Sequence, residues 1–115
     1  MSETAFFLAP DLTLAVTATE RLSNYFYEQF GAKPWKEESE AARSAEQARD
    51  QVLERAGLNI QKLFQQTGNL AVVGDNLWVH TSGGQNARLT ITSRRLDHDI
   101  EGDYQLLFYF ICLEN

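Results

Sequence analysis

The stretch that decides the fold is residues 104–113, Tyr-Gln-Leu-Leu-Phe-Tyr-Phe-Ile-Cys-Leu. Both sets of alternate positions are apolar, and Gln105 is its only strongly polar residue. Aromatic and aliphatic side chains at this density are typical of a strand that is covered on both faces. We therefore expect residues 104–113 to form a strand that needs cover on each face and a partner along each edge.

Two kinds of cover can satisfy this strand. The run at residues 5–8, Ala-Phe-Phe-Leu, can pair with it inside the chain while helices cover one face. A second protomer can instead cover the other face or continue the sheet, because exposed apolar surface marks interfaces in soluble proteins. The two are not exclusive, and we expect the protein to self-associate as a homodimer or higher oligomer. The interface candidates on one face of the strand are Leu107, Tyr109, Ile111 and Leu113.

Two segments upstream of this strand carry a helical period. Residues 17–20, Thr-Ala-Thr-Glu, predict a capping box with Thr17 as the N-cap and Glu20 at the third helical position, and the apolar spacing that follows ends at Gly31. A second helical pattern begins at Glu37. Gly57 is a weak helix former, so this pattern predicts either one long helix or two consecutive ones before Gly68.

After Gly68 the pattern becomes strand-like, and glycine-containing turns separate the strands. The expected strands are residues 69–73, 77–81, 87–96 and 104–113. Two short apolar runs, residues 5–8 and 12–16, are separated by Pro10 and Asp11, and either is a candidate for an edge strand. The fold class is therefore α+β, with two or three N-terminal helices packed on one face of a four- or five-stranded antiparallel meander sheet. A single domain is expected over residues 1–115.

The composition limits the classes of partner. The chain has 115 residues, of which 43% are hydrophobic and 23% charged, as in ordinary globular domains. Its net charge of −6 disfavours nucleic acid and anionic membrane surfaces, since binding to phosphates requires Lys and Arg. One cysteine excludes an intrachain disulfide, and no signal or membrane-spanning pattern is present. We therefore expect a cytoplasmic protein that contacts neither nucleic acid nor membrane.

The segment at residues 97–103, Asp-His-Asp-Ile-Glu-Gly-Asp, is the sharpest local motif. Asp97, Asp99 and Glu101 place oxygen ligands at alternate positions with glycine at the sixth, as in the first half of a calcium-binding EF-hand loop. The twelfth position, which should be a bidentate Glu, is Phe108. The three carboxylates are thus divalent-metal candidates, and an acidic solvated hairpin tip is the alternative. No cofactor is expected.

Few other residues offer chemistry. The two histidines, His80 and His98, are not spaced with a nucleophile and an orienting group, so no catalytic residue is predicted. Cys112 lies inside the last apolar strand, where a small buried side chain is the ordinary role of cysteine. Trp35 follows Pro34 in a loop and is a candidate interface anchor, with a lid over the helix–sheet junction as the alternative.

These observations favour a non-enzymatic cytosolic binding or regulatory module that acts through protein contacts and self-associates. The basis is surplus apolar strand surface in a chain without a catalytic constellation. The alternative is a small-molecule-binding or enzymatic domain with a pocket between the helices and a concave sheet. The residues expected to line that pocket are Tyr25, Trp78, His80 and Tyr109.

Overall fold

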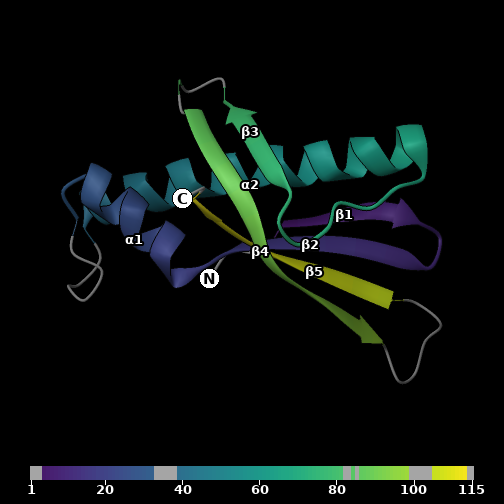
Figure 1. Ribbon diagram of the computed structural model, residues 1–115. Coiled ribbons are helices and arrows are strands. Elements are labelled where there is room, and N and C mark those ends of the chain that lie inside the picture. The colour runs from purple at the N-terminus through teal and green to yellow at the C-terminus, as the bar shows by residue number, and fades with distance from the viewer. Residues whose placement is uncertain (1–3, 33–38, 82–83, 85, 99–104, 114–115) are drawn as a thin grey trace.

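The computed structural model describes residues 4–32, 39–81, 84, 86–98 and 105–113. In chain order the elements are β1 (Thr4–Ala9), β2 (Leu12–Ala18), α1 (Glu20–Gln29), α2 (Glu40–Thr67), β3 (Asn76–His80), β4 (Asn86–His98) and β5 (Gln105–Leu113). The predicted α+β class is confirmed (Figure 1). The described residues contain two helices, and because two strands precede them the helices do not form an N-terminal block.

The five strands form one curled sheet in the order β1-β2-β5-β4-β3 (Figure 1). β2 and β5 are parallel, with Val16 beside Tyr109, whereas the other neighbours are antiparallel. The prediction of a purely antiparallel meander is therefore wrong. The physical reason lies in β2, whose residues from Leu14 to Thr17 are all buried and therefore require an interior position next to another buried strand.

The position of β5 explains how the last strand is covered. It lies between β2 and β4, so both of its edges are paired within the chain. The run at residues 5–8, one of the two candidates for its partner, belongs to β1 and pairs with β2 instead. β5 therefore needs no second protomer along its edges.

Both helices begin at side-chain caps, and the cap of α1 is Thr19 rather than the expected Thr17, which is a buried residue of β2. The hydroxyl of Thr19 accepts from the Leu22 amide at 3.2 Å, and the hydroxyl of Ser39 accepts from the Ala42 amide at 3.1 Å. These bonds satisfy amides that have no partner inside the first helical turn. α2 is a single helix of 28 residues, and it ends at Gly68, whose φ of 76° is the left-handed cap that glycine favours.

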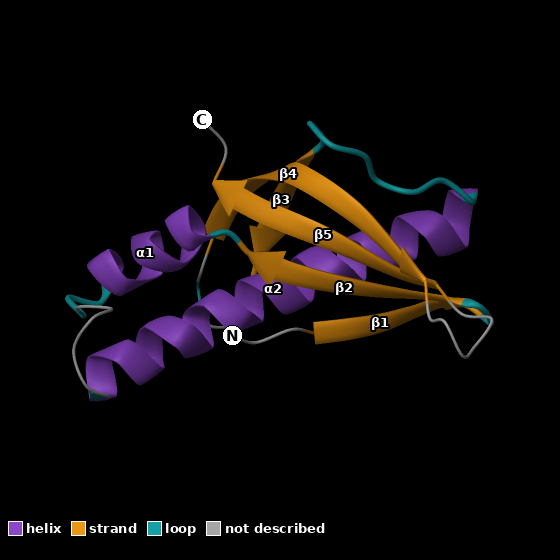
Figure 2. Cartoon of the chain, turned by 90° about the horizontal axis from the view of Figure 1, so that it is seen from below, coloured by secondary structure: helices purple, strands orange, loops and turns teal. Residues whose placement is uncertain are grey.

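α2 packs along one face of the sheet, and α1 lies beside the C-terminal ends of β2 and β5 (Figure 2). We call the face against α2 the inner face and the opposite one the outer face. Gly57 explains the close packing, because a Cβ at this position would lie 2.0 Å from the Phe6 ring of β1. The largest fully buried side chains of the resulting core are Tyr109, Leu14, Leu22, Leu53, Ile60, Leu89, Ile91 and Ile111.

Residues 68–75 connect α2 to β3 and contain no strand, contrary to the expected strand at residues 69–73. The segment ends in a turn in which Asp75 N–H donates to the Val72 carbonyl at 3.0 Å, and Gly74 takes a φ of 96°. The Asp75 carboxylate accepts from the Val72 amide at 2.9 Å. Val72 and Val73 stay about half exposed, whereas Ala71 is buried in the core, so the apolar run enters the core only in part.

The alternation of β4 side chains between the two sheet faces shifts by one residue at Thr92. The pairing with β5 shifts between Ile91 and Ser93, so Thr92 is the extra residue of a bulge. Before the bulge, Leu89 and Ile91 point into the core. After it, Arg94 pairs with the buried Tyr109 and lies on the inner face.

Candidate functional site

The sharpest contrast between two faces of one strand occurs in β3. Val79 is 1% exposed and packs on the inner face, whereas Trp78 beside it is 57% exposed. Successive side chains of a strand point to opposite faces, so Asn76, Trp78 and His80 share the outer face. A large exposed aromatic side chain next to a buried strand position is the unusual feature here.

The Trp78 indole is held by an arginine of the neighbouring strand. Arg88 is the cross-strand partner of Trp78, and its guanidinium carbon lies 4.0 Å from the ring centroid. Such cation–π contacts contribute about 0.5–1 kcal/mol at exposed sites. The indole therefore has a preferred orientation although it is open to solvent.

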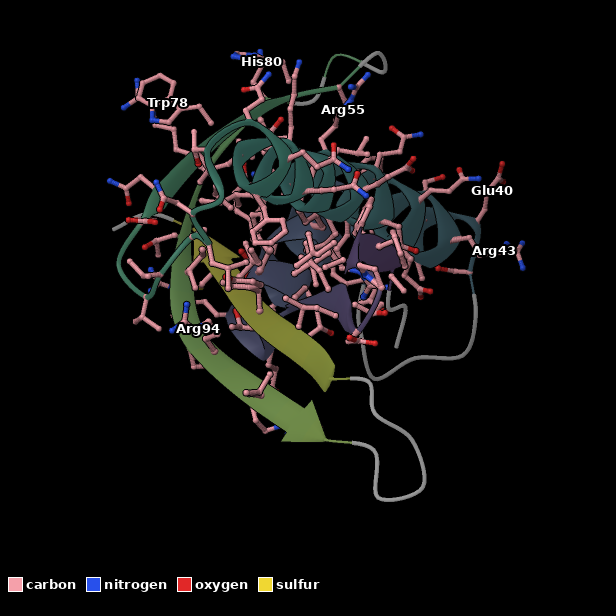
Figure 3. All side chains as sticks on the ribbon, turned by 90° about the vertical axis from the view of Figure 1, so that its right-hand side faces the viewer. Glu40, Arg43, Arg55, Trp78, His80 and Arg94 are labelled. Carbon is pink, nitrogen blue, oxygen red and sulfur yellow. The ribbon has the colours of Figure 1, made fainter. Side chains whose placement is uncertain are left out.

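The next cross-strand pair on the same face is polar. His80 Nδ1 lies 2.7 Å from Asn86 Oδ1, and since an amide oxygen only accepts, Nδ1 donates in this contact. A shallow hollow of about 240 Å³ lies between the two pairs, lined by Trp78, His80, Asn86, Ala87 and Arg88. Figure 3 shows Trp78 and His80 together at the periphery of the molecule.

β3 is also an edge of the sheet, and its register defines which backbone groups face outward. Ile91 N–H donates to the Asp75 carbonyl at 3.0 Å, and Gly74 N–H donates to the Ile91 carbonyl at 2.9 Å, so Ile91 directs both of its backbone groups toward the start of β3. Bonded and non-bonded pairs alternate in an antiparallel ladder, so Leu77 and Val79 direct their backbone groups toward β4. Asn76, Trp78 and His80 direct their N–H and C=O groups to the free edge. Within the described ranges no strand pairs beyond β3.

A second polar cluster holds the segment that leads into β3. The hydroxyl of Tyr109 and the guanidinium of Arg94 both donate to the carbonyl of Ala71. Burial raises the pKa of the Tyr109 hydroxyl above its ordinary value of 10.0, and Arg94 partly opposes this shift. Figure 3 shows Arg94 on the curled β4, away from Trp78 and His80. This cluster anchors residues 68–75 against the sheet.

A third polar cluster joins the two helices. Arg49 is 7% exposed, pairs with Asp50 at 3.1 Å and donates to the Ser23 hydroxyl at 3.4 Å. The Tyr27 hydroxyl donates to Glu46 at 3.1 Å. Burial first, and then the Glu46 carboxylate, raise the pKa of Tyr27. The groups satisfy one another across the α1–α2 contact, so this cluster has a structural role.

The predicted interface residues of the last strand do not form a free surface. Tyr109 and Ile111 have no exposed area, because both point to the inner face beneath α2. Leu107 and Leu113 lie on β5, and their side chains fall outside the described ones. Trp35 lies outside the described residues. Tyr109 and Ile111, which were expected at an interaction surface, are therefore part of the protein's own core.

The four residues expected to line a pocket lie in three separate places. Trp78 and His80 are on the outer face, Tyr109 is in the core, and Tyr25 is on α1. Tyr25 packs edge-on against Phe26 at 5.3 Å between ring centroids. The structure therefore brings together Trp78 and His80 and not the other two. The cause is the alternation of β3, which turns its aromatic and its histidine away from the helices.

Of the predicted metal ligands, only Asp97 is described. Both of its carboxylate oxygens lie 3.1 Å from guanidinium nitrogens of Arg95. Asp99 and Glu101 lie outside the described residues. Among the residues that are described, no group of three metal-ligating side chains occurs.

Sequence reasoning missed two contributors to the outer-face cluster, Arg88 and Asn86. Their signal is the period-two alternation of β3 and β4, which places them on the same face as Trp78 once the hairpin register is known. The sequence pattern leaves that register open, because the strand expected at residues 69–73 competes for pairing with β3. We call the cluster of Trp78, His80, Asn86 and Arg88 the tryptophan site.

Comparison of the chain with protein-family models, curated proteins and solved structures gave no match. In the part of the chain that the structure describes, none of the helices has the length and apolar character needed to cross a membrane. A function for this chain is therefore inferred from the chemistry of the tryptophan site.

Proposed function

We propose that the protein is a non-enzymatic cytosolic binding module, and that it contacts protein partners through the tryptophan site and the free edge of β3. The observation that carries the proposal is Trp78, which is 57% exposed and yet fixed by Arg88 at 4.0 Å. Tryptophan and arginine are among the residues most enriched at energetic hot spots of protein interfaces.

Preorganisation supports a protein partner at this place. An indole that already has a preferred orientation loses little rotamer freedom on binding, so more of its burial energy remains as affinity. The adjacent edge offers backbone donors and acceptors at Asn76, Trp78 and His80, which an added strand can pair with. Side-chain anchor and backbone edge thus lie on the same five-residue strand.

The shape of the site also favours a protein over a small molecule. Sites for small ligands are concave and bury most of the ligand, whereas the hollow beside Trp78 is shallow and about 240 Å³ in volume. The alternative of a pocket between helices and sheet requires Tyr25 and Tyr109 to join Trp78 and His80. Tyr25 and Tyr109 lie on other elements, so no observation favours that alternative.

The test is affinity capture from lysate of the native cell, comparing wild type with Trp78→Ala. Phe7→Ala is the matched control, because Phe7 is also an aromatic residue of an edge strand and is 62% exposed. We expect Trp78→Ala to lose partners that Phe7→Ala retains. Retention of every partner by a folded Trp78→Ala variant would place the binding surface elsewhere.

A further inference from the structure

We infer that the free edge of β3 pairs with the β3 edge of a second copy of this chain, antiparallel and with Trp78 on the two-fold axis. This inference rests on the proposed function and names the partner of the same site. It relocates the self-association expected from the sequence from β5, which is internal, to β3, which is an edge. The backbone and the side chains of β3 both complement a second copy of the same strand.

The backbone is self-complementary in one register. With Trp78 opposite the partner's Trp78, Asn76 lies opposite the partner's His80, and the reverse pair follows by symmetry. These are the residues whose N–H and C=O groups face the free edge. Every outward-facing backbone group of β3 then forms a bond across the axis, as in a regular antiparallel ladder. A shift of the axis by one residue leaves some of them unpaired.

The side chains fit the same register. On the inner face, Leu77 lies opposite the partner's Val79, so the apolar layer continues across the axis. On the outer face the two Trp78 rings meet, flanked by their own Arg88 side chains. β3 has the sequence Asn-Leu-Trp-Val-His and carries neither Lys nor Pro, the residues that commonly protect exposed edges. Nothing in the strand opposes pairing with itself.

The neighbouring flank of α2 is complementary in charge. A hollow of about 340 Å³ beside the end of β3 is lined by Gln51, Glu54, Arg55, Leu58 and Thr81. With Trp78 on the two-fold axis, Thr81 lies opposite the partner's Asp75, and the helices of both copies lie on the same side of the joined sheet. Arg55, which lines the hollow beside Thr81, is therefore on the side of the partner's Asp75, whose carboxylate is opposite in charge. Figure 3 shows Arg55 on the same side of the molecule as Trp78 and His80.

The other edge of the sheet does not compete. The carbonyl of Phe7 in β1 already accepts a hydrogen bond from Gln61 Nε2 of α2 at 2.7 Å. A strand pairing with β1 would have to displace this side chain. The area buried by pairing two five-residue strands is small compared with the roughly 1,200 Å² that stable complexes bury. We therefore expect a weak dimer whose population rises with protein concentration.

The experiment is sedimentation equilibrium on wild type, Trp78→Lys, Trp78→Glu and an equimolar mixture of the two variants. In the proposed dimer, residue 78 lies opposite residue 78 of the partner. Each variant alone therefore places like charges across the two-fold axis, whereas the mixture places opposite charges there. We expect concentration-dependent dimerisation of wild type, monomers for each variant, and dimers again in the mixture. Phe7→Lys, at the other edge, is the control that keeps the wild-type dimer.

Circular dichroism establishes that each variant is folded. Trp78→Pro is a second test, because it removes an outward-facing N–H without removing a bond to β4. We expect this variant to be monomeric too. A dimer that persists in Trp78→Lys and Trp78→Pro overturns the inference. Monomeric wild type that still captures another protein through Trp78 also overturns it and leaves the proposed function standing; capture of nothing overturns both.

Discussion

The two edges of the sheet differ in how the chain treats them. At β1, α2 lies so close that Gly57 leaves no room for a Cβ beside Phe6, and Gln61 occupies the outward Phe7 carbonyl. At β3, Asn76, Trp78 and His80 present backbone groups that no described strand pairs with. Because the long helix protects one edge and leaves the other exposed, we propose β3 as the edge used for binding. Variants at each edge test this difference, beginning with the largest expected effect.

Gly57→Val should give the largest loss of stability. Its branched side chain would enter the space of the Phe6 ring, where even a Cβ would lie 2.0 Å away. Overpacking of this kind costs about 2 kcal/mol in the free energy of unfolding, measured by urea denaturation. The double variant Gly57→Val with Phe6→Ala should lose less than the sum of the two single changes. Additive losses would show that α2 and β1 are not in this close contact.

Tyr109→Phe tests the anchor of the segment that positions the β3 edge. Loss of the hydroxyl bond to Ala71 should cost about 1 kcal/mol in unfolding free energy. The pKa of Tyr109 is raised on folding, so the folded state retains the proton that the unfolded chain loses near pH 10. This contribution is complete below about pH 10 and is lost as pH rises through the folded pKa.

The measurement is urea denaturation of wild type and Tyr109→Phe from about pH 8 to alkaline pH. The difference in stability between them should be constant up to about pH 10 and shrink above it. Tyr27 also has a raised pKa, but it is present in both proteins and cancels in the comparison. A difference that stays constant at alkaline pH would contradict the buried, neutral state of Tyr109.

Gln61→Ala should reopen the protected edge at little cost in stability. Its bond to the Phe7 carbonyl is exposed, so its loss should cost about 0.5 kcal/mol. In a Trp78→Lys background, where pairing through β3 is blocked, we expect Gln61→Ala to increase self-association in sedimentation. Unchanged self-association after Gln61→Ala, both in the wild-type protein and in Trp78→Lys, would mean that Gln61 does not protect β1.

Arg88→Gln should have the smallest effect on stability, about 0.5 kcal/mol, through loss of the contact with Trp78. The clearer readout is acrylamide quenching of Trp78 in a Trp35→Phe background, in which Trp78 is the only tryptophan. We expect stronger quenching after Arg88→Gln at concentrations where the protein is monomeric. Equal quenching would show that Arg88 does not cover or orient the indole.

The local parts of the fold could be predicted from the sequence. Residues 87–96 fall within β4, and residues 104–113 and 77–81 overlap β5 and β3, because their composition and period are strong. Gly68 does end the second helix. The long-range arrangement was not predictable from local pattern, since β2 pairs in parallel with β5 at the opposite end of the chain. Period alone contains no information on which apolar strand is placed beside β5.

The candidate site was only partly predictable for the same reason. Alternation places Trp78 and His80 on one strand face, but it does not say whether that face lies under the helices or in solvent. Which face of β3 is buried depends on whether Leu77 and Val79 pack against the core. Aliphatic residues also occur at exposed positions, so their presence in the sequence does not decide this. Tyr109 was expected at an interface because residues 104–113 are apolar on both faces, and the pattern does not say which face the core covers. Its buried hydroxyl bond to the Ala71 carbonyl depends on a long-range contact that the local pattern does not contain.

The most direct test of the central claim is amide hydrogen exchange of β3, followed by NMR at low and high protein concentration. Leu77 and Val79 donate toward β4 and should exchange slowly at both concentrations. The amides of Asn76, Trp78 and His80 face the free edge, and we expect them to exchange quickly in dilute protein and more slowly as concentration rises. Fast exchange of these three amides at every concentration would contradict pairing of the β3 edge between copies.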